Sequence, residues 1–137
     1  MNKKELEQPK AFEKFYYIDS DLDIREDYYV GSSINMLRVA IGNYFLTEEE
    51  AEAEAEKILV RRMLENIARR LNKGEGFDWK DINQDKYCLA IDGNTMVLVN
   101  QYGYKYQGVI YCLDKNFKNV AIKEIGEERL KKYLRGE

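Results

Sequence analysis

The sequence predicts an α+β protein with two antiparallel β-meanders, each followed by a helix, around one long central helix. Two observations lead to this fold class. Short segments rich in aromatic and β-branched residues alternate with turn signals in residues 14–41 and again in residues 86–112, which is typical of neighbouring antiparallel strands. Between these segments, the apolar residues of 48–72 recur at the spacing of a helix.

The chain of 137 residues has the length of one domain. Residues 1–13 are polar and show no periodicity, so we expect a flexible leader there. Residues 14–137 should form a single compact α+β domain, with sub-units that cover about 14–73 and 86–137.

The first meander is expected to contain three strands. Residues 15–18 and 24–30 form the first two, and the polar turn 19–21 separates them. After a Gly-Ser-Ser turn, the apolar and β-branched stretch 34–41 makes a third candidate strand.

The first turn contains three alternating aspartates, Asp19, Asp21 and Asp23, as a calcium-binding loop does. An EF-hand loop that began at Asp19 would need Gly at its sixth position and Glu at its twelfth. This chain has Ile24 and Val30 at those positions. We therefore interpret the segment as a solvated hairpin turn in which aspartate side chains cap the backbone.

Thr47 marks the start of the long helix. Together with Glu50 it matches a capping box, in which the Thr side chain accepts from the third helical N–H. The helix should run from about Glu48 to about Asn72 and end near Gly74.

Charge is strongly polarised along this helix. Residues 47–56 contain six glutamates and no base, whereas residues 57–73 contain six bases and one acid. The net charge of −3 for the whole chain hides these opposite local charges of −6 and +5. Arg62, Arg69 and Lys73 fall within about 40° of one another on a helical wheel, opposite the apolar face. A solvated face is the favoured interpretation, and nucleic acid or an acidic protein partner is the alternative.

The second meander begins with a clear hairpin. Residues 86–91 and 95–100 are its strands, and Asp92-Gly93-Asn94 is its turn. Another strand is expected over Tyr104–Cys112.

Two helices should complete the chain. Asp114 is the expected N-cap of the first, Gly126 ends it, and 127–134 forms the second. The junction Tyr111–Asp114 echoes Tyr44–Thr47, because an aromatic residue stands three positions before a polar cap in both. This echo indicates either a duplicated unit or two separate uses of the same capping arrangement.

Tyrosine is abundant, with eleven copies. Tyr102, Tyr104 and Tyr106 alternate and would share one face of a strand. Such a face suits either base stacking or packing beneath a helix, and we favour packing. Eleven tyrosines are nevertheless too many to be buried with every hydroxyl satisfied, so some should reach solvent or a partner. This surplus points to binding.

The sequence lacks several of the residue combinations that the common classes of enzyme use for catalysis. The absence of histidine excludes Ser-His and Cys-His nucleophile pairs and His-containing zinc sites. Cys88 and Cys112 lie in predicted strands, where we expect them to act as small apolar packing residues. The Gly-Glu-Gly segment 74–76 lacks the context of a phosphate-binding loop. We expect no catalytic residue, no metal site and no cofactor, and therefore no enzyme.

The chain also lacks features of membrane or secreted proteins. No apolar run approaches the roughly 20 residues of a membrane helix, and the first residues have no hydrophobic core of a signal peptide. We therefore expect a cytoplasmic protein without a membrane partner.

Three segments resemble a family of small proteins encoded by phages, prophages and integrative elements of Firmicutes. They are Tyr16–Asp21 (YYIDSD), Ile41–Glu52 (IGNYFLTEEEAE) and Ala121–Leu134 (AIKEIGEERLKKYL). The chain departs from the family at Leu22, where relatives tend to have Gly, and at Cys112, where they tend to have Phe. Most members have no assigned activity, so the resemblance implies genomic context and no catalytic residues. For a protein of that context, the expected cytoplasm is the host bacterial cytosol.

The sequence and the resemblance together predict a non-catalytic inhibitor of a host defence complex, similar to anti-CRISPR proteins. Its partner would be a host protein or ribonucleoprotein complex, and a homodimer is left open. A nucleic-acid-binding accessory protein, or one that sequesters a small signalling nucleotide, is the alternative. The candidate contact residues are Tyr102, Tyr104, Tyr106, Arg62, Arg69, Lys73, Glu48, Glu49, Glu52 and Glu56.

Overall fold

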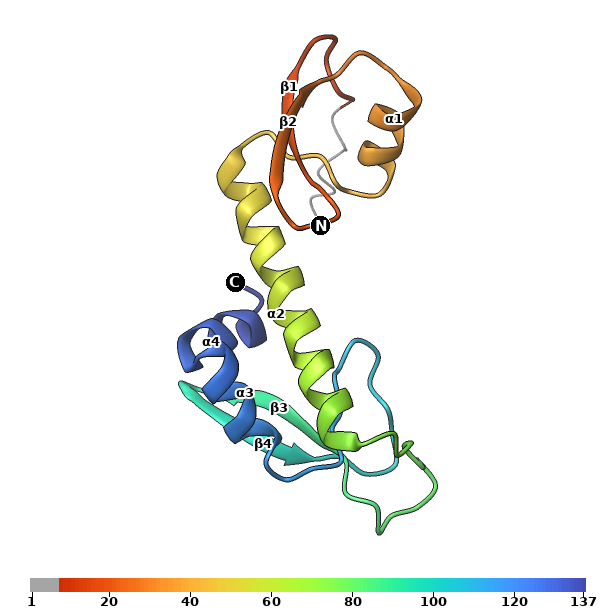
Figure 1. The fold of residues 1–137 in the computed structure, drawn as a ribbon, viewed down its shortest axis with the longest axis vertical. Coiled ribbons are helices and arrows are strands. Elements are labelled where there is room, and N and C mark those ends of the chain that lie inside the picture. Colours follow the sequence, from red (N-terminus) through yellow and green to blue (C-terminus); the bar gives the residue numbers. More distant parts are fainter. Residues whose placement is uncertain (1–7) are drawn as a thin grey trace. The chain divides into compact units, whose positions relative to one another are not determined.

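A computed structural model describes residues 8–137, and its four helices and two small antiparallel sheets confirm the α+β class (Figure 1). The chain divides into two compact units, an N-terminal unit of residues 1–57 and a C-terminal unit of residues 58–137. The boundary lies earlier than the predicted end of the first sub-unit at residue 73.

The N-terminal unit begins with a hairpin. Strands β1 (Lys14–Ile18) and β2 (Ile24–Tyr28) pair antiparallel, with Tyr16 opposite Glu26. The N–H of Phe12 donates to the carbonyl of Tyr29 at 2.8 Å, so the end of the predicted leader pairs with the hairpin. The rest of that prediction concerns residues 1–7, which lie outside the described residues.

Residues 34–41, predicted as a third strand, belong instead to helix α1 (Ser33–Ala40). Ser32 is its N-cap, and the Ser32 Oγ accepts from the N–H of Asn35 at 3.2 Å. The Asn35 side chain is buried and accepts from the N–H of Val30 at 2.9 Å. These side-chain bonds satisfy backbone donors locally, and this capping outweighs the strand preference of the apolar residues.

The Gly-Asn-Tyr-Phe segment 42–45 ties the unit to strand β1. Asn43 bonds both backbone groups of Ile18, accepting from its N–H at 2.7 Å and donating to its carbonyl at 2.8 Å. The Tyr44 ring stacks on buried Phe15 with centroids 4.4 Å apart. Phe45 then forms an isolated antiparallel bridge with Tyr16. This segment therefore has a structural role: it holds the chain before α2 against strand β1.

Helix α2 runs over Glu48–Asn72, as predicted. The Thr47 Oγ1 accepts from the N–H of Glu50 at 3.3 Å, which confirms Thr47 as the cap. Ala51 and Ala55 are buried within the N-terminal unit. The part of α2 after residue 57 is counted with the C-terminal unit, because its apolar side chains belong to the core of that unit.

The C-terminal unit contains the predicted second hairpin. Strands β3 (Tyr87–Asp92) and β4 (Thr95–Asn100) pair antiparallel, and Gly93 in the turn has φ +62°. Such a positive φ is the conformation that glycine adopts without strain.

Helices α3 (Phe117–Ile125) and α4 (Glu127–Arg135) end the chain, and Gly126 with φ +104° separates them as predicted. The start of α3 is a correction. Asn116 is the N-cap, whereas Asp114 accepts from the N–H of Asn116 at 2.8 Å in the turn before the helix. The buried core of the unit comprises Val60, Leu64, Ile67, Ala68, Met96, Cys112, Phe117, Ala121, Ile125 and Leu130.

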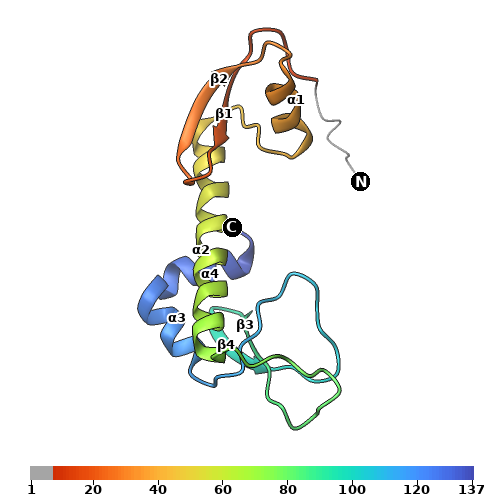
Figure 2. The same cartoon turned by 45° about the vertical axis from the view of Figure 1, so that its right-hand side comes forward.

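Residues 104–112, predicted as a strand, form an open loop that only Cys112 ties to the sheet (Figure 2). Cys112 bridges Tyr87 of β3, as Phe45 bridges Tyr16 of β1. The two junctions that echo each other in sequence thus make the same contact in their units. Each predicted meander is a two-stranded hairpin with one bridging residue. In the second, turns at Gly103 (φ +79°) and Gly108 (φ +81°) interrupt the extended backbone, and in the first, α1 takes the place of the third strand.

Candidate partner-binding surface

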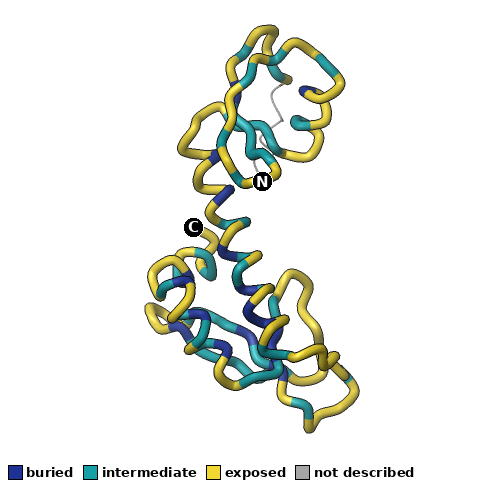
Figure 3. The backbone as a smooth tube through the Cα atoms, viewed as in Figure 1, coloured by how far each residue is buried: buried dark blue, intermediate teal, exposed yellow. Residues whose placement is uncertain are grey.

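The loop of residues 101–110, here called the tyrosine loop, displays three aromatic side chains. Tyr102, Tyr104 and Tyr106 are 52%, 76% and 57% exposed, and the loop is exposed along most of its length (Figure 3). The prediction that they pack beneath a helix is wrong, because the segment forms no strand that could face one. The expectation that some tyrosines reach solvent is confirmed.

The backbone of the tyrosine loop is held at several points. Arg61 Nη1 donates to the carbonyl of Gly108 at 3.1 Å. The N–H of Tyr106 donates to the hydroxyl of Tyr111 at 3.0 Å, and the carbonyl of Tyr106 accepts from Val109 at 3.4 Å. The exposed rings therefore project from a constrained backbone, which lowers the entropy lost when a partner binds.

A second loop, residues 73–86, supports the tyrosine loop through aromatic contacts. The ring of buried Tyr111 meets Trp79 edge-on at a centroid distance of 4.8 Å and Phe77 at 6.4 Å. Edge-to-face pairs of this kind are worth about 0.5–1.5 kcal/mol each. Trp79 and Tyr111 thus join the two loops.

Lys86 organises the supporting loop from within. Its side chain is 1% exposed, and its Nζ donates to the carbonyls of Asp81 and Gln84 at 3.1 and 3.0 Å. The same Nζ lies 5.2 Å from the centre of the Trp79 ring. A buried ammonium group is tolerated only when such partners replace water. The sequence does not indicate that Lys86 is buried, since a lysine at the start of a strand is usually exposed.

Of the predicted basic face, Arg62 and Arg69 lie on α2, whereas Lys73 follows the last helical residue with φ +50°, so the helical wheel does not place it on that face. Arg62, Arg69 and Lys73 are exposed, and they form no ion pair with any residue that the structure describes. Arg70, by contrast, pairs with Glu124 of α3. The three side chains therefore keep their charge available for an anionic partner.

The predicted acidic contact residues, Glu48, Glu49, Glu52 and Glu56, are exposed at the start of α2. They belong to the N-terminal unit, whereas the tyrosines and the basic face belong to the C-terminal unit. We therefore treat the acidic residues as a surface of their own.

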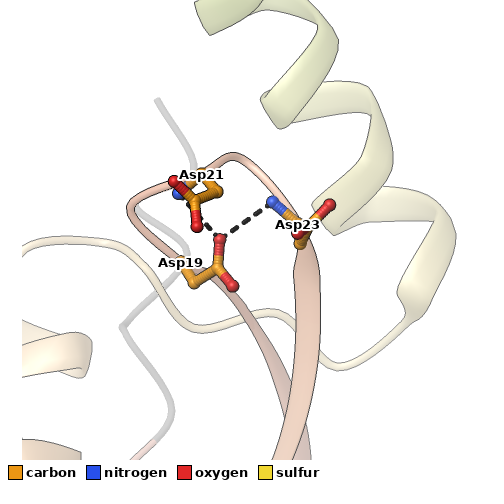
Figure 4. A group of neighbouring side chains, drawn as sticks. All are labelled: Asp19, Asp21 and Asp23. Atoms are coloured by element: carbon orange, nitrogen blue, oxygen red, sulfur yellow. Dashed lines mark hydrogen bonds between the residues drawn. The ribbon is translucent and has the colours of Figure 1, made fainter.

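The aspartate turn has the predicted capped geometry (Figure 4). One carboxylate oxygen of Asp19 accepts from the N–H groups of Asp21 and Asp23 at 2.9 and 3.0 Å. The other accepts from Arg25 Nε at 2.9 Å, and this bond lowers the pKa of Asp19. The three carboxylates come within 4.8 Å of one another, but both oxygens of Asp19 already serve the turn.

A surface depression of about 430 Å³ lies near the end of α2 in the C-terminal unit. Lys73 and Lys115 line it together with Glu75, Asp85 and Asp114. Three carboxylates beside two ammonium groups disfavour a phosphate-bearing ligand, because like charges repel at these short distances. The depression therefore lends no support to sequestration of a nucleotide.

The two cysteines are buried packing residues, as expected. Burial raises the pKa of the Cys88 and Cys112 thiols, so both stay protonated at neutral pH.

Comparison of the chain with protein-family models, with curated proteins and with solved structures found no match. Among the helices of residues 8–137, none has the length and apolar character needed to cross a membrane.

Proposed function

We propose that this protein is a non-catalytic binding protein of a phage or mobile element that inhibits a host defence complex, as anti-CRISPR proteins do. The observation that carries the binding role is the tyrosine loop. Three exposed tyrosines project from a backbone that side chains of Arg61 and Tyr111 hold in place. Such a rigid aromatic surface suits recognition without chemistry.

The composition of the tyrosine loop favours a protein as the partner. Its sequence, QYGYKYQGVI, combines tyrosine, glycine and glutamine with a single charge at Lys105. Antibody paratopes rely on the same combination, because tyrosine supplies contact area and a polar tip at little entropic cost. A surface tuned to phosphates would instead carry several bases.

The inhibitory role rests on the resemblance to phage and mobile-element proteins of Firmicutes. An inhibitor that acts by occupying a surface needs no catalytic group. A small protein with a preformed aromatic surface can bind one host protein or ribonucleoprotein complex at equal stoichiometry and block it.

A pull-down from host lysate tests this proposal. The wild-type protein should capture one specific defence component, and the triple variant Y102A/Y104A/Y106A should lose it. Substitution of a tyrosine in an interface commonly costs about 2 kcal/mol or more, so titration of the single variant Tyr104→Ala against the captured partner should show roughly 30-fold weaker binding. Tyr28→Ala, which removes a tyrosine 52% exposed in the N-terminal unit, is the matched control. Equal capture by wild type and triple variant would refute the proposal.

The basic face supports a second candidate function, binding of nucleic acid. Arg62 and Arg69 form no ion pair with any described residue, and neither does Lys73, although Lys73 shares a surface depression with Glu75, Asp85 and Asp114. Three phosphate contacts predict that the logarithm of affinity falls with the logarithm of salt at a slope of roughly −2 for single strands. Fluorescence anisotropy with labelled single-stranded DNA measures this slope. Replacement of all three residues by Gln should abolish binding, and an unchanged slope would rule out this surface.

A further inference from the structure

Helix α1 exposes an apolar face. Ile34, Leu37 and Ile41 recur at positions i, i+3 and i+7, which places them within about 60° of one another around the helix. Their side chains are 55%, 56% and 65% exposed, and neighbouring Val30 is 64% exposed. Four large aliphatic residues together on the surface of so small a unit are unusual for a soluble protein and mark an interaction site.

In most surface helices the apolar side faces the protein and the polar side faces solvent. In α1, polar residues make the contacts with the rest of the unit. Asn35 is buried and bonds the backbone of Val30. Arg38 lies 3.5 Å from the centre of the Tyr17 ring and pairs with Asp27 at 3.1 Å. Folding of the N-terminal unit thus uses the polar side of α1 and leaves its apolar side outward.

The N-terminal unit that carries this face is strongly anionic. Residues 8–57 contain five bases and twelve acids, a net charge of −7. Three of the five bases are already paired with acids of the same unit. These pairs are Lys14–Glu26, Arg25–Asp19 and Arg38–Asp27. The unit therefore combines an apolar helix face with a net negative charge that attracts cationic partners.

We propose that the exposed face of α1 docks a cationic amphipathic helix of a partner protein. The apolar side of that helix would cover Ile34, Leu37 and Ile41, and its flanking Lys and Arg side chains would be attracted by the acidic unit. A second copy of this chain fits less well, since two units of charge −7 repel each other. This surface lies in the N-terminal unit, so the inference is independent of the tyrosine loop.

Fluorescence anisotropy with model peptides tests the docking site in the full chain. The probe is a labelled amphipathic helix of Leu and Lys. One comparison peptide replaces Lys by Glu, and another keeps the Leu/Lys composition in a scrambled order without an apolar face. We expect the Leu/Lys helix to bind at least 10-fold more tightly than either, and its affinity to fall with added salt.

Substitutions locate the site. Leu37→Ser and Ile41→Ser should each weaken binding of the Leu/Lys helix by 10-fold or more. Ile82→Ser, which removes a side chain 73% exposed in the C-terminal unit, should change nothing. Far-UV circular dichroism checks that the variants fold, and Leu37→Gln replaces Leu37→Ser if it does not.

Three results would overturn the inference. If the Leu/Glu helix binds as tightly as the Leu/Lys helix, positive charge is not recognised. If the scrambled peptide binds as tightly as the Leu/Lys helix, the apolar helix face is not recognised. Analytical ultracentrifugation could also reveal a dimer of the wild type that Leu37→Ser dissociates, and the occupant would then be a second copy.

Discussion

The two units of this protein reach stability in different ways. The C-terminal unit buries a connected apolar cluster of ten residues. Among residues 8–57 of the N-terminal unit, the buried side chains are Phe15, Asn35, Ala51 and Ala55. The N-terminal unit therefore depends on side-chain hydrogen bonds to the backbone, whereas burial of apolar surface dominates in the C-terminal unit.

The units also differ in charge. Residues 8–57 carry −7, and residues 58–137, with fifteen bases and eleven acids, carry +4. A weakly charged total thus conceals two units of opposite sign. Because long-range attraction depends on local charge, the N-terminal unit should attract cationic partners and the C-terminal unit anionic ones.

The largest expected effect comes from the core of the C-terminal unit. Phe117→Ala should lower the free energy of unfolding by about 3–5 kcal/mol, because it leaves a cavity beside buried neighbours. Urea unfolding followed by fluorescence of Trp79, the single tryptophan, measures this loss in the same unit. A loss below 1 kcal/mol would contradict the apolar core as the main source of its stability.

Lys86→Met should destabilise the C-terminal unit by roughly 2–3 kcal/mol. The change leaves the carbonyls of Asp81 and Gln84 without their donor, and relief of the buried charge offsets part of that cost. The same fluorescence assay applies. Lys80→Met, at an exposed lysine of the same loop, should be neutral. Equal stability of the two variants would mean that Lys86 does not organise the loop.

Asn43→Ala should cost the N-terminal unit about 1–2 kcal/mol, since both of its bonds to Ile18 are lost while water can reach the strand. Hydrogen exchange read by mass spectrometry should show faster exchange in β1 and β2. Asn43→Asp keeps the acceptor for the Ile18 N–H but sets a carboxylate oxygen against the Ile18 carbonyl, so it should lose at least as much. Unchanged exchange in Asn43→Ala would show that the two hydrogen bonds between Asn43 and Ile18 are not needed for the stability of the hairpin.

Leu22→Gly should stabilise the N-terminal unit by about 0.5–1 kcal/mol. Leu22 has φ +66°, a left-handed conformation that is strained for any residue with a Cβ. Thermal unfolding measures the gain, and Leu22→Ala, which keeps the strain, should show none. If Ala stabilises as well as Gly, the backbone explanation fails.

The smallest effect concerns pH. The bond from Arg25 holds the pKa of Asp19 below its ordinary value of 3.8. A carboxyl whose pKa is lowered by folding adds stability above its unfolded pKa, and this stability disappears as pH falls through the folded pKa. Urea unfolding at pH 5 and below pH 3 should show a small loss at the lower pH. Asp19→Asn should reduce that loss, and an identical loss in wild type and variant would assign it elsewhere.

Local signals in the sequence were enough for several elements. Thr47 and Glu50 predicted the start of α2, Asp92-Gly93-Asn94 predicted the β3–β4 turn, and Gly126 predicted the break between α3 and α4. Each signal acts through neighbouring backbone groups, so no distant residue can overrule it easily.

The sequence predicted the exposure of some candidate contact residues but not of others. Exposure of Arg62 and Arg69 followed from helical periodicity alone, whereas Lys73 lies beyond the end of α2. Exposure of Tyr104 and its neighbours did not, because alternation indicates a shared face only when a partner strand pairs with the segment. That partner is absent along residues 104–110.

The sequence by itself determined the cap of α2, the β3–β4 turn, the long helix and the separation of charge, all of which depend on residues close together in the chain. The helix of residues 33–40 has a local cap at Ser32 that the apolar pattern concealed. The tertiary structure decided that Lys86 is buried and that the tyrosine loop is open. The physical reason is that strand pairing and burial depend on contacts between distant residues. Their free energy belongs to the assembled fold and not to any local pattern.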